Sequence, residues 1–261
     1  MQIAERFDKI VWRVTQKNQR GAKKMRKIVK AVAVATSLTI MSAMLAGCSS
    51  ESLKEEKSED YIQEYVEAVM DCSYKGELDP YVENTDADED DAEEVYEACT
   101  QYYAKEIMYL LDVNYEVISE DILNEYYEFG KEIMMNSKYS VGKGKSTGDD
   151  SWEVIVKIQP IDMIALCEDE LQEYADSFAA KYADLDTSSM TEEDFIPYED
   201  EFAEGVLDVL EAAADNIEYG DEIEYTVEVT EQDDAYKVSD DQWNEIDDLV
   251  VGMDNYYSDS E

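Results

Sequence analysis

Hydrophobic residues recur along this chain with two different periods, and the changes of period define the expected elements. From residue 59 to residue 75 apolar side chains return every three or four positions, which predicts an amphipathic helix that ends at Gly76. A capping box at Thr191 and Asp194 predicts the start of another helix. The same spacing predicts further helices from about Asp88, after Ser119, from Ile161 to about Asp184, from Thr191 to about Asn216, and over 240–250.

At two places between these helices the period becomes two, which is typical of half-buried β-strands. The alternating runs Tyr139–Val141 and Trp152–Ile158 flank a turn sequence at 146–150, and together they predict a β-hairpin. A second alternating run covers 222–229 and is followed by a short strand over 235–238. This pair predicts a second hairpin.

The order of these elements predicts an α+β fold that is rich in helix and contains two antiparallel β-hairpins. There is also a faint internal similarity. A helix that begins Glu120-Asp121-Ile122 leads to the first hairpin, and one that begins Glu193-Asp194-Phe195 leads to the second. The alternatives are a duplication of two similar α+β halves and a chance similarity between amphipathic helices.

The N-terminal region has a different character from the rest of the chain. Five basic residues within 23–30 precede an uncharged apolar stretch over 31–46, which ends in Leu45-Ala46-Gly47-Cys48. A basic flank, an apolar core and a small-residue cleavage site predict a secretory signal peptide. The alternative is an uncleaved N-terminal anchor, for which this apolar stretch is short because a spanning helix needs about 20 residues.

The ending Leu45-Ala46-Gly47-Cys48 resembles the lipobox of bacterial lipoproteins, and the resemblance covers residues 25–48. It implies cleavage between Gly47 and Cys48 by the lipoprotein signal peptidase. It also implies a diacylglyceryl group on the Cys48 sulfur, which would hold the protein at the outer face of the cytoplasmic membrane. Stable membrane anchoring requires about two acyl chains, and this modification provides two.

These signals divide the chain into a leader over 1–47, a lipidated polar tether over 48–58, an acidic domain over 59–251 and a disordered tail over 252–261. A leader of this length is long, because signal peptides usually run about 15–30 residues. Translation from Met25 would give a leader of ordinary length. We therefore hypothesise that residues 1–24 are not translated.

The whole layout resembles uncharacterised lipoproteins of Gram-positive bacteria, in which a lipobox precedes an α+β domain without an assigned activity. Apart from the lipobox, the residues that carry this resemblance are Tyr74–Leu78, Trp152–Pro160, Tyr236-Lys237-Val238 and Trp243. The resemblance implies no functional residue beyond Cys48.

Charge excludes several classes of function for the part that follows the leader. From residue 48 onward there are 11 lysines, no arginine and 64 acidic residues, a net charge of −53 over 214 residues. Such a domain does not bind nucleic acid through phosphates, and charge does not attract it to an anionic membrane. The chain has no histidine, which excludes Ser-His-Asp, Cys-His and histidine–metal chemistry. We expect a protein that is not an enzyme and holds no cofactor.

One acidic stretch matches part of a calcium-binding loop. Asp86, Asp88, Asp90 and Glu97 fall at positions 1, 3, 5 and 12 of the template, but position 6 is Asp91, where a glycine is required. The alternative is the acidic first turn of a helix, where negative charge suits the helix dipole. A third alternative is weak, diffuse binding of Ca²⁺ or Mg²⁺ by the acidic surface as a whole.

Three cysteines remain after Cys48, namely Cys72, Cys99 and Cys167, and each lies on the apolar face of an expected helix. Buried free thiols and a Cys72–Cys99 disulfide are both compatible with these positions.

These observations predict a surface-anchored binding or interaction module. Its partners would be the membrane, through the lipid on Cys48, the lipoprotein-processing enzymes, and an unidentified protein or cell-wall component. The alternatives are a small solute-binding lipoprotein and a divalent-cation-binding surface protein.

Overall fold

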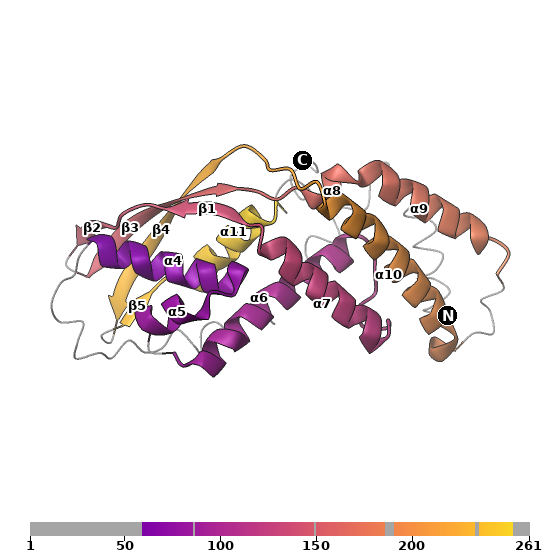
Figure 1. Cartoon of the computed structure of the whole chain (residues 1–261), viewed down its shortest axis with the longest axis horizontal. Helices are drawn as coiled ribbons and strands as arrows, with labels where there is room; N and C mark the ends of the chain where they lie inside the picture. Colours follow the sequence, from indigo (N-terminus) through magenta and orange to yellow (C-terminus); the bar gives the residue numbers. More distant parts are fainter. Residues whose placement is uncertain (1–58, 86, 149, 186–190, 233–234, 253–261) are drawn as a thin grey trace. The chain divides into compact units, whose positions relative to one another are not determined.

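The computed structural model describes residues 59–85, 87–148, 150–185, 191–232 and 235–252 (Figure 1). The described helices are α4 (Glu59–Lys75), α5 (Leu78–Asn84), α6 (Glu89–Leu110), α7 (Glu120–Met134), α8 (Met163–Leu166), α9 (Glu168–Lys181), α10 (Glu192–Ala214) and α11 (Asp240–Val250). The described strands are β1 (Lys138–Val141), β2 (Lys145–Gly148), β3 (Ser151–Gln159), β4 (Ile223–Gln232) and β5 (Ala235–Lys237). This content confirms the predicted α+β class.

The described chain forms two compact units, neither of which is a continuous half of the sequence. The helical unit contains the described parts of Tyr103–Gly130 and Asp162–Glu218. The sheet unit contains the described parts of 59–102, Lys131–Ile161 and 219–252, and therefore all five strands together with α4, α5 and α11. The division falls within α6 and α7 and follows the type of element, not the two similar stretches of sequence.

The strands form one antiparallel sheet in the order β1-β3-β4-β5, with β2 also paired to β3. β3 and β4 lie side by side along their length, so that Val154 is opposite Val227 and Val156 is opposite Tyr225. The face that carries Trp152, Val154, Val156 and Ile158 is buried, and α4 and α11 pack in contact with β3 (Figure 1). Because side chains alternate between the two faces of a strand, the period of two in the sequence marks this buried face.

The predicted first hairpin is present, but its first strand is interrupted. β1 and β2 pair one after the other with β3, and residues 142–144 separate the two strands. The Gly144 N–H donates a hydrogen bond to the Glu59 carbonyl at the start of α4, over 2.9 Å. A Cβ at Gly144 would lie 2.8 Å from the Cβ of Ile62, so this close approach requires glycine.

One expected helix is divided in the structure, and one short helix was not expected. The stretch expected as one helix from Ile161 to about Asp184 is divided at Cys167, whose φ of −132° leaves the helical region and separates α8 from α9. The residues after Gly76 form the short helix α5, although Pro80 lies there. Pro80 is tolerated because it falls in the first turn, where backbone N–H groups have no partner within the helix.

In the helical unit, α9 and α10 form a hairpin with a mainly aromatic seam. The rings of Phe178 and Phe202 lie with centroids 5.1 Å apart, and the ring of Tyr174 stacks beside Phe202 at 6.0 Å. A Cβ at Gly205 would come within 2.1 Å of the Tyr174 ring. Gly205 therefore allows the tyrosine to lie against the α10 backbone.

Candidate functional site

The predicted lipid-attachment and cleavage residues, Cys48 and Gly47, lie outside the described residues. None of the helices α4–α11, which the structure describes, combines the length and the apolar character that crossing a bilayer requires.

The structure does not bring the predicted calcium ligands together. Asp86 lies outside the described residues, and Asp88 precedes the first residue of α6. The Asp91 N–H donates to the Asp88 carboxylate over 3.0 Å, and the Asp88 N–H donates to the Asp91 carboxylate over 3.2 Å. These reciprocal bonds form a helix cap, as in a capping box, and they occupy a carboxylate that the metal site would need.

The two remaining acids of that template are on α6 itself. Asp90 and Glu97 are exposed and seven residues apart, which corresponds to about 10.5 Å along the helix axis. That separation is too large for shared coordination of one calcium ion, whose ligand distances are about 2.3–2.6 Å. Among the described residues, no group of three or more acidic or cysteine side chains is arranged to hold a metal ion.

The three cysteines of the domain are free thiols. The Cys72 thiol donates a hydrogen bond to the Ala92 carbonyl over 3.4 Å, and the Cys167 thiol donates to the Met163 carbonyl over 3.3 Å. Burial raises the pKa of Cys72 to about 12 and that of Cys167 to about 11, and it raises the pKa of Cys99 further. None of these thiols is therefore activated as a nucleophile at neutral pH.

The sheet unit contains a cluster of tyrosines and carboxylates that the sequence did not reveal, which we call the Tyr–Asp cluster. It consists of Asp71, Tyr74 and Lys75 at the end of α4, Tyr139 on β1 and Asp247 on α11. The rings of Tyr74 and Tyr139 meet edge to face at 5.8 Å and join the two carboxylates into one group.

In one half of the Tyr–Asp cluster the negative charge is balanced. The Asp71 carboxylate accepts a hydrogen bond from the Tyr139 hydroxyl over 2.6 Å and pairs with the Lys75 ammonium over 2.7 Å. The same ammonium lies 4.1 Å from the centre of the Tyr139 ring, a cation–π contact. Burial, followed by the hydrogen bond to Asp71, raises the pKa of Tyr139, so that its hydroxyl remains a donor.

In the other half, the described groups that act on the carboxylate include no cation. The Tyr74 hydroxyl donates to the Asp247 carboxylate over 2.5 Å, and Tyr74 is 1% exposed. Burial raises the pKa of Asp247 to about 6, although the Tyr74 hydrogen bond opposes the shift. Asp247 in turn adds to the burial that raises the pKa of the Cys99 thiol. A carboxyl group that titrates near neutrality in a packed environment is typical of functional groups, and it also occurs in structural networks.

Two buried polar atoms accompany this half of the cluster, the Ser73 hydroxyl and the Trp243 indole N–H, and neither has a hydrogen-bond partner of good geometry among the described residues. Ser73 nevertheless lowers the pKa of the Cys99 thiol against the effect of burial. Ser73 is the neighbour of Tyr74 in sequence, and Trp243 precedes Asp247 by one helical turn.

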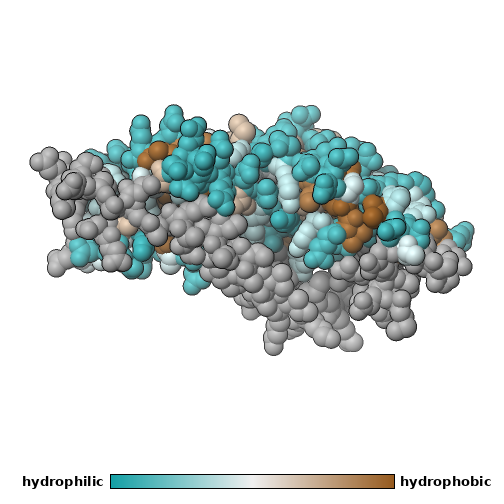
Figure 2. Space-filling model, turned by 90° about the horizontal axis from the view of Figure 1, so that it is seen from below, coloured by the Kyte–Doolittle hydropathy of each residue, from teal (hydrophilic) through white to brown (hydrophobic). Residues whose placement is uncertain are grey.

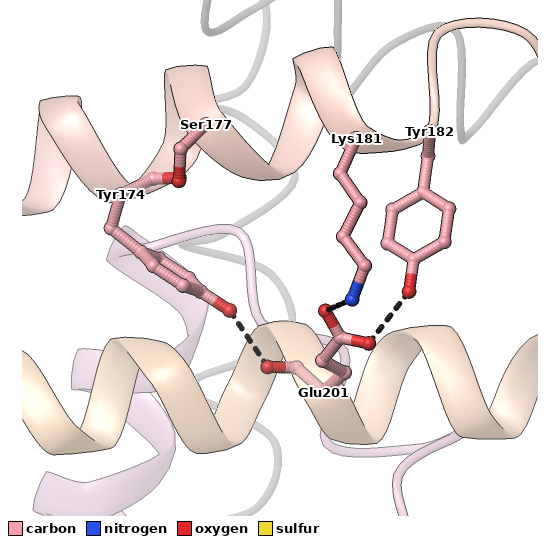
Figure 3. Close-up of polar contacts among 5 residues, drawn as sticks. All are labelled: Tyr174, Ser177, Lys181, Tyr182 and Glu201. Atoms are coloured by element: carbon pink, nitrogen blue, oxygen red, sulfur yellow. Dashed lines mark hydrogen bonds and ion pairs between the residues drawn. The ribbon is translucent and has the colours of Figure 1, made fainter.

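A second polar group lies in the helical unit, between α9 and α10 (Figure 3). The Glu201 carboxylate pairs with the Lys181 ammonium and accepts a hydrogen bond from the Tyr182 hydroxyl over 2.6 Å. The Tyr174 hydroxyl donates to the Glu201 backbone carbonyl over 2.7 Å. The bond to Lys181, then that to Tyr182, lowers the pKa of Glu201. Every oxygen of Glu201 is thus engaged within the hairpin, which makes this group a helix–helix contact.

The described surface is mainly hydrophilic on the face that Figure 2 shows, and hydrophobic atoms are gathered there in only a few areas. Among the described residues, the large hydrophobic side chains that are exposed to solvent are Tyr109, Met135, Ile155 and Ile223. Among them Met135 is the most exposed, at 59%. The described part of this face is therefore largely solvated, and most of the large apolar side chains are in the interior.

The Tyr–Asp cluster could not have been predicted from the sequence, because its members are up to 176 positions apart. Tyr74 belongs to the apolar face of the predicted first helix, and Tyr139 to the alternating first strand. The one signal in the sequence was Asp247 itself. It lies four residues after Trp243 and three before Val250, on the buried face of α11, where a carboxylate is out of place.

No protein-family model matches the sequence, and no curated protein matches it. The crystal structure of a "putative lipoprotein" (YcdA) from Bacillus subtilis subsp. subtilis str. 168 is similar, with a TM-score of 0.52 and 15% sequence identity. The similarity covers 74% of this chain and 57% of that chain, so this chain spans little more than half of that protein's length. At this identity the likeness shows a shared fold.

Proposed function

We propose that the protein is an extracytoplasmic lipoprotein, anchored through Cys48, whose acidic α+β domain acts as a binding or interaction module at the cell surface. The observation that carries this proposal is the sequence Leu45-Ala46-Gly47-Cys48 after a basic flank and an apolar core. The shared fold with a protein described as a putative lipoprotein supports it.

The chemistry of the described domain favours binding over catalysis. The chain has no histidine, and burial keeps the three thiols of the domain protonated at neutral pH. In the group around Glu201, both carboxylate oxygens are engaged by Lys181 and Tyr182 of its own hairpin, which is typical of a structural contact. The partner would be an unidentified protein or a cell-wall component.

The charge of the domain limits the kind of partner that it can bind tightly. A net charge of −53 after the leader repels other acidic surfaces, so a tight partner must be basic, neutral or bridged by cations. The lipid would hold the domain close to its partner and raise their effective concentration, so that even a weak contact could be occupied.

Membrane retention tests the anchoring directly. Cells expressing the full chain are grown with a labelled fatty acid and fractionated, and the wild type is compared with Cys48→Ser and with Cys99→Ser. We expect label in the wild type and in Cys99→Ser, both in the membrane fraction, and no label in Cys48→Ser. Equal labelling of Cys48→Ser, or membrane retention of the wild type without any label, would show that the anchoring proposal is wrong.

A further inference from the structure

Two aspartates in the Tyr–Asp cluster share the same kind of partner but have different surroundings. Each accepts one tyrosine hydroxyl, Asp71 from Tyr139 and Asp247 from Tyr74. Asp71 also has the Lys75 ammonium at 2.7 Å. The described groups that act on the Asp247 carboxyl do not include a cation. The electrostatic cost of an ionised carboxylate therefore falls on Asp247.

The contact between Tyr74 and Asp247 joins two elements that are 173 positions apart in the sequence. α11 is held to the sheet unit by the buried side chains Trp243, Ile246 and Val250, and by a hydrogen bond from the Ile161 N–H to the Val250 carbonyl over 2.9 Å. Asp247 lies on this same face. Asp247 is only partly exposed, so an ionised carboxylate there is incompletely hydrated, and placing a charge in such surroundings without a counter-charge is costly.

The titratable groups that the described contacts place beside Asp247 are Tyr74 from α4 and Cys99 from α6, and both stay neutral in the range concerned. Tyr139 from β1 lies behind Tyr74, and the paired charges of Asp71 and Lys75 lie beyond Tyr139. Burial is the largest cause of the raised pKa of Tyr74, and Asp247 itself is the next. The proton that responds to mild changes of pH in this cluster is therefore the one on Asp247.

We propose that the packed junction between α4 and α11 at Tyr74 and Asp247 is sensitive to protons: it is more stable when the Asp247 carboxyl is protonated, and α11 opens more readily when this carboxyl is ionised. This inference does not depend on lipid anchoring. Such a junction would make the stability of the domain respond to mild acidification.

The direction follows from linkage. The pKa of Asp247 is about 6 in the folded domain, above the ordinary value of about 3.9 for an unfolded chain. The folded state therefore binds the proton more tightly, and the stability that this group contributes is present at low pH. It is lost as the pH rises through the folded pKa. With these two values the unfolding constant rises about tenfold more between pH 5.0 and pH 7.5 than it would without this carboxyl.

The test uses the full chain in a mild detergent, with urea unfolding at pH 5.0 and pH 7.5. The wild type is compared with Asp247→Asn and with Asp241→Asn, a matched loss of one charge at an exposed position of the same helix. We expect the pH dependence of the unfolding constant to fall about tenfold in Asp247→Asn and to stay at the wild-type value in Asp241→Asn. Equal pH dependence in all three proteins would overturn the proposal.

A titration of the folded protein measures the protonation of Asp247 directly, without unfolding. The carboxyl ¹³C signals of aspartate are followed by NMR, and the Asp247 signal is identified by its loss in Asp247→Asn. We expect its midpoint near pH 6, and higher still in Tyr74→Phe, because the phenol hydrogen bond favours the ionised form. A midpoint at the ordinary value near 4 would overturn the proposal.

Discussion

At the scale of single residues, the same side chain serves different purposes according to what surrounds it. The acids of the predicted calcium loop are separated in this way: Asp88 caps α6, whereas Asp90 and Glu97 remain in solvent. The sequence contained both interpretations of this stretch. It could not choose between them, because the spacing that suits a calcium loop also places acids in a helical first turn.

Substitutions at Asp88 and Asp90 separate the cap from a metal site. Replacing Asp88 by alanine should lower the free energy of unfolding by about 1 kcal/mol, because the α6 cap loses the bond from the Asp91 N–H to the Asp88 carboxylate, while the reciprocal bond from the Asp88 N–H remains. Asp90→Ala should change it by less than about 0.5 kcal/mol, since this side chain is exposed. Urea unfolding with and without calcium measures both. A calcium-dependent stabilisation that both variants abolish would restore the metal site.

Gly205 offers a second prediction at this scale. An alanine would place its Cβ 2.1 Å from the Tyr174 ring, so Gly205→Ala should destabilise the protein by about 1–3 kcal/mol despite the better helix propensity of alanine. In a Tyr174→Ala background the same change should become neutral or stabilising by up to about 1 kcal/mol. A double-mutant cycle by urea unfolding measures the coupling, and additive effects would contradict the contact.

At the scale of elements, the hydrophobic period predicted the helices and strands that bury one face. It missed features that depend on local backbone geometry. The helix over 59–75 and the alternation around Trp152 follow from burial of one face, and both are present. The division at Cys167 and the short helix α5 depend on single backbone angles and on a tolerated proline, which leave no periodic signal. The pairing of β3 with β4 joins both hairpins into one sheet through contacts that are distant in sequence.

The interruption between β1 and β2 gives a prediction for α4. Gly144→Ala should destabilise the protein by about 1–3 kcal/mol, because the new Cβ would meet Ile62 and the backbone oxygen of Glu59. The matched control is Gly148→Ala, where the nearest atom is the hydroxyl of Ser151, which can rotate away. Thermal unfolding of the two variants compares them, and equal stabilities would show that the hairpin is free of α4.

At the scale of the whole molecule, charge sets the behaviour of the domain in solution. A net charge of −53 over the 214 residues after the leader makes the folded state repel itself, and salt screens this repulsion. The fold class could be predicted because apolar residues are regularly spaced in spite of this charge. The partner could not be predicted, since acidic residues recur along the whole sequence after the leader and do not single out one region.

Thermal unfolding in different salts tests whether this stabilisation comes from general screening or from binding of one cation. Raising potassium chloride from about 10 to 150 mM should increase the unfolding temperature of the full chain, because the Debye length falls from about 30 to 8 Å. Calcium and magnesium chloride at matched ionic strength should stabilise it to the same extent if no ordered site exists. A larger stabilisation by calcium alone, at low concentration, would instead favour the divalent-cation-binding alternative.

The anchoring of the protein is tested most directly by mass spectrometry of its N-terminal peptide after purification from cell membranes. The account predicts a peptide that begins at Cys48 and carries a diacylglyceryl group on its sulfur, with no peptide from residues 1–47. A peptide that runs through Gly47 and an unmodified Cys48 would contradict it, and the domain would then require a different explanation for its place in the cell.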